Sequence, residues 1–419
     1  MCQWCHKERI VDMIKIIDGG VTVAKGYQAA GAEAGIKYQG RNDMALVYTE
    51  TAAVCAGTFT TNVVKAAPVQ WDKELVKQGN PVHAVVLNSG IANACTGEEG
   101  RKLNYAMAKA VADQFSIKPE EVLTASTGVI GMQLPEVPLQ KGAALLKESL
   151  AATAEAGKSA AEAIMTTDTV SKQSSVTVEV EGQVFSIGGM CKGSGMIHPN
   201  MATMLSVTTT DVAVEQSVLQ EMVSEIVADS FNMISVDRDT STNDTYLVLA
   251  NGESGVKVEK GTKIYDAFRE ALAYVSTELA KKMAADGEGC TKLVEVTVKN
   301  CESKEKAKIL AKSVITSNLV KTAMFGSDAN WGRILCALGY AGVSFDPEII
   351  DLTIMAKGES LNIVQNGVAT GYSEEKATKL LSQEAVTVVC DMKEGNSEAT
   401  AWGCDLTHEY VTINGDYRS

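Results

Sequence analysis

The sequence predicts a mixed α/β (α+β) fold in which helices and sheets stack as layers. Apolar runs of strand length and apolar residues at helical spacing both recur, and the two patterns alternate through both halves of the chain. The length of 419 residues exceeds a usual single core, so it admits either two or three domains or one large layered fold. Because no internal repeat or low-complexity linker divides the sequence, the layered fold is favoured.

The first half of the chain contains strands that end in polar loops. Residues 81–87 form a continuous apolar run, typical of a strand covered on both faces, and they lead into the polar loop 88–97. Apolar residues at helical spacing then predict a helix over 98–115. A further strand is expected over 121–126.

Two helices and a hairpin follow. Residues 139–165 are rich in helix-forming residues, and we expect two helices interrupted at Gly157. Residues 175–180 and 183–187 alternate valine with polar residues on either side of Glu181-Gly182. This pattern predicts a β-hairpin.

The second half of the chain continues the alternation. Its clearest helices are 213–231 and 263–285, each with apolar residues along one side. Further helices are expected over 305–316, 328–339 and 373–382. Strands are expected over 233–237, 246–250, 292–298, 351–355, 385–391, 398–404 and 409–413.

Composition and charge argue against several classes of function. A net charge of -14 and a pI near 4.9 argue against nucleic acid as a partner, because phosphate binding needs clustered Lys and Arg. No apolar run reaches the ~18 residues of a membrane span, and the sequence does not begin with the basic and apolar regions of a signal peptide. We therefore expect a cytoplasmic protein that contacts neither nucleic acid nor a membrane.

The cysteines do not indicate a disulfide scaffold. Ten are scattered along the chain, whereas small secreted domains space them densely. Cys95, Cys336 and Cys390 have apolar neighbours, so we expect them to be buried thiols.

The N-terminus carries one metal-like spacing. Cys2, Cys5 and His6 match the pattern of covalent haem attachment, but no export signal precedes them and no second cysteine pair completes a zinc site. We therefore expect residues 1–12 to be a disordered extension, with adventitious metal binding as the minority interpretation, and we predict neither a metal site nor a cofactor.

The stretch 192–205 reads Lys-Gly-Ser-Gly-Met-Ile-His-Pro-Asn-Met-Ala-Thr-Met-Leu. A threonine that follows a small residue and a glycine-containing run can be the nucleophile of a self-cleaving protein. Cleavage between Ala202 and Thr203 would give Thr203 a free α-amine that acts as its own general base. A glycine loop entering a buried strand has the same pattern, so these residues alone leave both interpretations open.

Three other positions carry candidate chemistry. Thr127-Gly128 ends a predicted strand and can present a hydroxyl and an N–H as an oxyanion hole, although a tight turn uses the same residues. The polar run 237–244 fits a cation site or, more commonly, a hydrogen-bonded turn. Glu288 lies between two glycines, where the backbone can approach a ligand closely.

The stretch 192–205, with Thr127-Gly128 and Thr166-Thr167-Asp168, resembles the ornithine acetyltransferase family of arginine biosynthesis. The resemblance covers essentially the whole chain after residue 12. It implies a layered α-β-β-α sandwich, as in ornithine acetyltransferases and DmpA-like enzymes. It also implies self-cleavage into an α fragment, residues 13–202, and a β fragment, residues 203–419. Two of each would form a heterotetramer, and both would contribute to one catalytic unit.

The resemblance also assigns roles to individual residues. It makes Thr203 the nucleophile, with Thr127 and Gly128 at the oxyanion. The implied substrate-binding residues are Thr166, Lys192, Thr203, Glu288, Asn414 and Ser419. By spacing alone, Thr167 fits as well as Thr166. The chain departs from the family pattern at Ile91, Arg238 and Ser419, where a polar residue, a glycine and a threonine are usual.

The implied function is a glutamate N-acetyltransferase. It would transfer acetyl from N²-acetyl-L-ornithine to L-glutamate by a ping-pong reaction through an acetyl-threonine, without a cofactor. Some members of the family also accept acetyl-CoA, and no phosphate-binding motif in this sequence distinguishes the two kinds. Two other interpretations stay open: an N-terminal-nucleophile aminopeptidase or amidohydrolase, and an uncleaved metabolite-binding protein.

Overall fold

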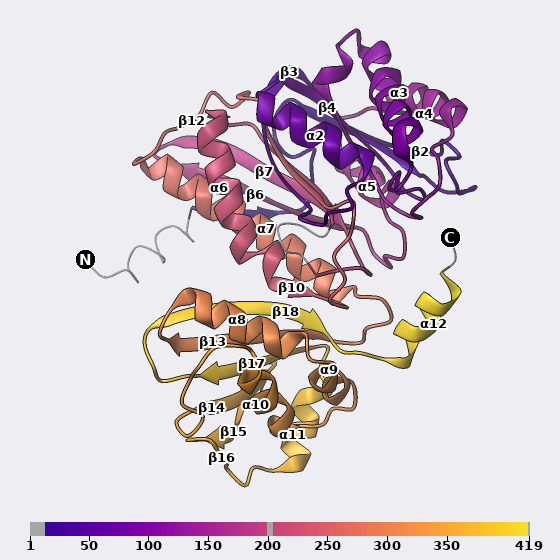
Figure 1. The fold of residues 1–419 in the computed structure, drawn as a ribbon. Coiled ribbons are helices and arrows are strands. Elements are labelled where there is room, and N and C mark those ends of the chain that lie inside the picture. Colours follow the sequence, from indigo (N-terminus) through magenta and orange to yellow (C-terminus); the bar gives the residue numbers. More distant parts are fainter. Residues whose placement is uncertain (1–12, 199–203, 418–419) are drawn as a thin grey trace.

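The computed structural model describes residues 13–198 and 204–417 (Figure 1). The expected extension 1–12, the cleavage position Ala202-Thr203 and Ser419 therefore lie outside the described residues. Figure 1 shows a larger body above a smaller one. Apart from residues 234–235, the strands of the smaller body all follow α7 (Lys263–Ala285) in the chain.

The larger body contains a nine-stranded sheet with two halves. One half contains β2 (Tyr27–Ala32), β4 (Val82–Asn88) and β5 (Val122–Ser126). The other contains β1 (Ile14–Ile17), β6 (Lys172–Val180), β7 (Gln183–Lys192), β8 (Leu205–Thr210) and β11 (Thr245–Ala250). The long strand β3 (Met44–Phe59) belongs to both, because its residues 44–48 pair with β2 and β4 and its residues 54–59 pair with β11.

The two halves of the sheet pack face to face. Successive side chains of a strand point to opposite faces, and along β3 they enter two different cores. Ala45 and Val47 share a core with Leu205 and Leu247 of the other half, whereas Leu46 points away from it. A closed apolar layer thus lies between the two halves.

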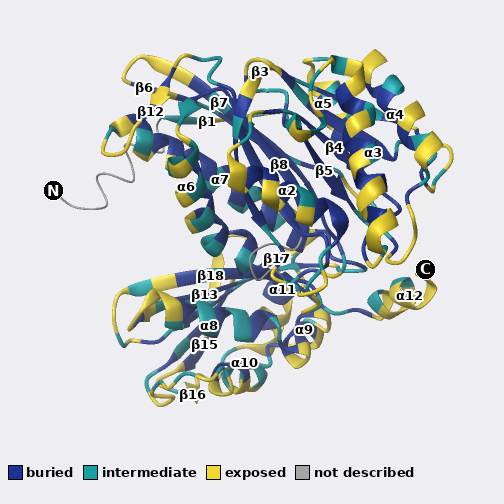
Figure 2. Cartoon of the chain, turned by 45° about the horizontal axis from the view of Figure 1, so that its top comes forward, coloured by how far each residue is buried: buried dark blue, intermediate teal, exposed yellow. Residues whose placement is uncertain are grey.

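Helices cover both outer faces of the sheet. Leu46 packs with Met107 of α3 (Gly97–Phe115) and Leu139 of α4 (Glu136–Glu148). On the other outer face, Phe185 meets Phe268 of α7 at 5.9 Å between ring centroids, and α6 (Gln216–Asp229) joins the same core. Figure 2 shows the strands as a buried layer between more exposed helices. The predicted α-β-β-α sandwich is confirmed.

Two further helices contribute to the core between the sheet halves. Leu75 of α2 (Ala67–Gln78) and Ala160 of α5 (Ala154–Ala163) both pack there. The remaining short elements of this body are the 3₁₀ turns η1 (Pro119–Glu121) and η2 (Phe231–Met233) and the paired strands β9 (Ala213–Val214) and β12 (Lys257–Val258).

The smaller body is built on a seven-stranded sheet. In sheet order its strands are β10 (Ile234–Ser235), β18 (Ser397–Cys404), β13 (Leu293–Cys301), β17 (Ala385–Asp391), β14 (Asp351–Ala356), β15 (Glu359–Gln365) and β16 (Val368–Ala369). Its helices are α8 (Lys304–Ile315), α9 (Asn318–Phe325), α10 (Trp331–Gly339) and α11 (Glu374–Leu381). Val296 and Leu310 share one apolar core with Phe268 of α7, so the two bodies are packed continuously.

Most predicted elements are present, and two predictions were wrong. The hairpin turns at Glu181-Gly182, where both residues have positive φ, as predicted. Residues 409–413, expected to be a strand, lie in helix α12 (His408–Asp416). The two helices expected within 139–165 separate at residues 149–153 rather than at Gly157, because the Thr153 side chain accepts from Ala156 N–H and begins α5 there.

The buried-thiol prediction holds for one cysteine of three. Cys390 is buried, whereas Cys95 and Cys336 are exposed. In the part of the chain that the structure describes, none of the helices combines the length and apolar composition of a bilayer-crossing segment.

Candidate active site

A cavity of about 140 Å³ gathers the predicted site residues. Its lining includes Thr127, Gly128, Thr166, Lys192, Glu288 and Asn414. These residues come from the ends of β5 and β7, from the loops after α5 and α7, and from α12. Pockets for drug-sized ligands measure roughly 300–1,000 Å³, so this cavity suits a ligand of amino-acid size.

The predicted oxyanion residues form a tight turn with unused donors. Thr127 N–H donates to Asn88 O at 3.0 Å and Val129 N–H donates to Gly90 O at 3.1 Å, which fixes the turn after β5. Among the described residues, neither the Thr127 hydroxyl nor the Gly128 N–H has a hydrogen-bond partner. Gly128 has a φ of 129°, and a Cβ there would lie 2.2 Å from Gly90 C, so only glycine fits. The turn and oxyanion-hole interpretations are thus compatible.

Lys192 brings a positive charge to the cavity. Its Nζ donates to Thr166 Oγ1 at 2.8 Å, while Asp168 Oδ2 stands at 3.7 Å. Thr167 also lines the cavity, but of the two threonines Thr166 is the one whose hydroxyl accepts a hydrogen bond from Lys192. This contact supports the choice of Thr166.

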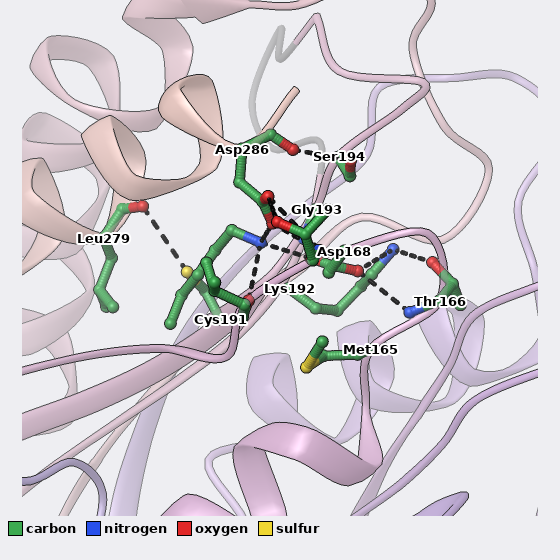
Figure 3. A network of polar contacts seen from close by, with 12 residues as sticks. Met165, Thr166, Asp168, Cys191, Lys192, Gly193, Ser194, Leu279 and Asp286 are labelled. Atoms are coloured by element: carbon green, nitrogen blue, oxygen red, sulfur yellow. Dashed lines mark hydrogen bonds and ion pairs between the residues drawn. The ribbon is translucent and has the colours of Figure 1, made fainter. Parts of the chain in front are cut away.

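A buried ionic network lies behind Lys192, and the sequence did not predict it (Figure 3). Lys172 Nζ lies 2.7 Å from Asp168 Oδ1 and 2.5 Å from Asp286 Oδ2. Burial alone would raise the pKa of Asp168, but Lys192 and Lys172 outweigh it and hold that pKa well below its ordinary value. Burial likewise lowers the pKa of Lys172, and the two carboxylates more than compensate for it. Asp168 and Lys172 are therefore both charged at neutral pH.

Glu288 brings a negative charge to the same cavity. Its N–H donates to Ser194 O at 3.1 Å, and its Oε2 accepts from Asn414 Nδ2 at 2.7 Å. A Cβ on Gly195 would lie 2.3 Å from Glu288 Cδ, so the glycine permits the close approach of the two chain segments. The glycine that makes room for Glu288 thus lies in the stretch 192–205, and close approach of a ligand to the backbone beside Glu288 stays a prediction.

Helix α12 carries Asn414 to the cavity. It contributes no buried residue and lies beside the C-terminus, away from the strands (Figures 1 and 2). Thr407 Oγ1 donates to Gly289 O at 2.6 Å, and Tyr410 hydroxyl donates to Asp237 Oδ2 at 3.3 Å. The helix is thus attached through the loop that holds Glu288.

The remaining predicted positions are Ala202, Thr203 and Ser419, which lie outside the described residues. Their described neighbours Met204 and Tyr417 both line the cavity.

The polar run 237–244 forms a hydrogen-bonded turn. Asn243 Nδ2 donates to Ala92 O at 2.6 Å and to Ser126 O at 2.8 Å. Asp244 lines the cavity, and burial raises its pKa well above the ordinary value despite hydrogen bonds from Ser241 and Thr60. The described residues contain no group of three or more His, Cys, Asp or Glu side chains arranged for a metal ion.

Ile91 and Arg238, where the chain departs from the family pattern, both lie within the described residues. Ile91 is 2% exposed and pairs with Thr127 and Val129, so it packs behind the turn. Arg238 has a φ of 72°, in the left-handed region that favours glycine.

The network behind Lys192 was missed because its members are distant in sequence. Asp286 is 114 residues from Lys172. The one local signal was the spacing of four residues between Asp168 and Lys172, which is common on any helix surface.

Comparison with known proteins agrees with these observations. The model of the ArgJ family matches residues 28–419. A relative from Caldanaerobacter subterraneus subsp. tengcongensis, named arginine biosynthesis bifunctional protein ArgJ, is 48% identical over 408 residues, covering 97% of this chain and 100% of the relative. The protein of the same name numbered ArgJ 1 from Clostridium acetobutylicum is 47% identical over 415 residues, covering 98% and 100%.

Solved structures of similar sequence also match parts of the chain. The crystal structure of an arginine biosynthesis bifunctional protein argJ from Bacillus halodurans has 40% identity and a TM-score of 0.47, covering 50% of this chain and 97% of that chain. Ornithine acetyltransferase from Mycobacterium tuberculosis, complexed with ornithine, has 42% identity and a TM-score of 0.42, covering 45% and 100%. The match over residues 28–419 and the full-length relatives show that this chain belongs to the ArgJ family, the acetyltransferases of arginine biosynthesis.

Proposed function

We propose that this chain is a glutamate N-acetyltransferase that moves acetyl from N²-acetyl-L-ornithine to L-glutamate, releasing ornithine and N-acetylglutamate. One observation carries the proposal. The unused donors at Thr127-Gly128, the Lys192 ammonium and the Glu288 carboxylate line one cavity together with Met204, the residue that follows Thr203.

The nucleophile in this proposal is Thr203. Cleavage after Ala202 frees its α-amine, whose ordinary pKa is about 7.7–8.0, so a minor fraction of it is unprotonated at neutral pH. The amine accepts the hydroxyl proton while Oγ attacks the acetyl carbonyl. Thr127 hydroxyl and Gly128 N–H donate to the oxyanion of the tetrahedral intermediate, a contribution typically worth about 2.7–4 kcal/mol per donor.

The reaction then proceeds in two halves. Collapse of the first intermediate leaves acetyl-Thr203 and releases ornithine. Glutamate enters the same cavity, its amine attacks the ester, and N-acetylglutamate leaves with Thr203 restored. Lys192 binds the α-carboxylate that both substrates share, and Glu288 receives a substrate ammonium.

Strand pairing supports a stable complex of the two fragments, 13–202 and 203–419. Strand β8 of the second fragment lies between β7 of the first and β11. Strand β11 in turn pairs with β3 of the first fragment. Cleavage would therefore leave the fragments joined by sheet hydrogen bonds, and native mass measurement tests whether two of each assemble as a heterotetramer.

Isotope exchange tests the ping-pong reaction. Labelled ornithine incubated with unlabelled N²-acetylornithine and the protein, without glutamate, should become incorporated into acetylornithine. Absence of exchange alongside full transfer activity would rule out an acetyl-enzyme intermediate. Replacing acetylornithine with acetyl-CoA in the glutamate assay determines whether the chain also accepts that donor.

The same assays separate the two alternatives. An N-terminal-nucleophile amidohydrolase would release acetate from acetylornithine without glutamate, because water replaces the amine acceptor. A metabolite-binding protein would bind the amino acids with neither exchange nor acetate release.

A further inference from the structure

Lys172 is a buried ammonium with every donor in use. Its side chain is 1% exposed. Nζ binds Asp168 Oδ1 at 2.7 Å, Asp286 Oδ2 at 2.5 Å and Val170 O at 3.3 Å. An ammonium has three donors, so Lys172 has none left for a ligand.

Asp168 is held at both oxygens. Oδ1 accepts from Lys172 and from Gly193 N–H at 2.7 Å, and Oδ2 accepts from Thr166 N–H at 3.0 Å. These bonds fix the carboxylate between Lys172 and Lys192. Figure 3 shows Asp286, Asp168 and Thr166 as successive parts of one network beside Lys192.

Lys192 is left incompletely paired by this arrangement. Its Nζ has one hydrogen bond, to Thr166, and lies 3.7 Å from Asp168 Oδ2, beyond a normal hydrogen bond. Within the described residues two of its donors are therefore unused, and its side chain lines the cavity.

Asp286 is the second carboxylate that pairs with the Lys172 ammonium. Asp286 follows the last residue of α7 and also accepts from Thr169 N–H at 3.0 Å. It supplies the second negative charge that Lys172 requires, so Asp168 and Asp286 together carry two charges against Lys172 and Lys192. These charges balance, but the two ion pairs at hydrogen-bond distance are both made by Lys172, whereas Lys192 lies at 3.7 Å.

We propose that Lys172 is a positioning residue for the transfer reaction: it holds Asp168 and Asp286 so that Asp168 Oδ2 stays 3.7 Å from Lys192 Nζ and does not form a hydrogen-bonded ion pair with it. The Lys192 ammonium then keeps two donors for the substrate α-carboxylate. This inference rests on the proposed function, because it concerns binding of the two amino-acid substrates at Lys192.

The simplest variant, Lys172→Met, leaves two buried carboxylates with one remaining ammonium and is open to misfolding. Two double variants avoid that imbalance. Lys172→Met with Asp286→Asn leaves Asp168 next to Lys192, and Lys172→Met with Asp168→Asn leaves Asp286 instead. Both variants remove the Lys172 ammonium and one carboxylate. They differ only in whether Asp168 or Asp286 keeps its carboxylate.

The proposal predicts that KM for acetylornithine and KM for glutamate are both about tenfold higher in the variant that retains Asp168 than in the variant that retains Asp286. The kcat values of the two should agree within about twofold, because Lys172 does not line the cavity. Equal KM values in the two double variants, or a difference confined to kcat, would overturn it. Failure of the proposed function is distinguishable, since the unaltered protein would then show no acetyl transfer.

Discussion

The side-chain amide of Asn414 donates to Glu288 Oε2 at 2.7 Å, so helix α12 holds the carboxylate that follows α7. Lys192 lines the same cavity. An amino acid with one carboxylate and one ammonium can satisfy both charged groups at once.

Glu288→Gln should weaken binding of acetylornithine. The amide keeps an oxygen that can accept from Asn414 but loses the charge, and a hydrogen bond to a charged group is worth about 1.5–3 kcal/mol. KM for acetylornithine should rise about 10–100-fold. Asn414→Ala is the comparison variant: it leaves the charge in place, and an effect as large as that of Glu288→Gln would contradict the ammonium role.

Substitution by valine discriminates the two neighbouring threonines. Thr166→Val removes the acceptor of the Lys192 hydrogen bond, whereas Thr167→Val keeps it. We expect KM for both substrates to rise several-fold in the first variant, consistent with roughly 0.5–1.5 kcal/mol for one hydrogen bond. Steady-state kinetics on both variants measure this, and a larger effect at Thr167 would refute the choice of Thr166.

Gly195→Ala should displace the Glu288 carboxylate. The added Cβ would lie 2.3 Å from Glu288 Cδ, closer than any real contact, so the carboxylate must move from the position in which Asn414 holds it. We expect a loss of activity of at least tenfold, read as kcat/KM. Gly339→Ala is the matched control, because a Cβ there meets nothing within 4 Å; equal losses in the two variants would contradict the account.

His198 should make stability depend on pH. Burial, followed by Lys312 and Arg238, lowers the pKa of His198 to about 4. Between that value and the unfolded value of about 6.5, the unfolded chain binds more protons, so stability is lost as pH falls through this window. His198→Gln should reduce the loss of unfolding free energy between pH 7 and pH 5 by about 1–2 kcal/mol, allowing for partial exposure. Denaturant titrations at both pH values measure it, and an unchanged loss would refute the assignment.

The helices and strands that could be predicted from the sequence are those that bury apolar residues at a regular spacing. Helix α7 has the predicted bounds because Phe268, Leu272 and Leu279 repeat at helical spacing and enter the core. Helix α12 was mistaken for a strand because its Tyr-Val-Thr-Ile run has high strand propensity. Because none of the residues of that helix is buried, its sequence lacks the apolar periodicity that would have indicated a helix.

Those residues of the candidate site that belong to a local sequence motif could be predicted. Thr127, Gly128, Lys192 and Glu288 each lie beside glycines or in a distinctive stretch, and the family resemblance assigned their roles. The network of Asp168, Lys172 and Asp286 has no such signal. It exists because β6, β7 and the end of α7 meet in space, which only the fold determines.

Intact mass of the purified protein tests the central claim most directly. The account predicts two fragments divided between Ala202 and Thr203, and a Thr203→Ala chain that stays whole and transfers no acetyl group. A single species of 44.4 kDa that nevertheless transfers acetyl from acetylornithine to glutamate would contradict it.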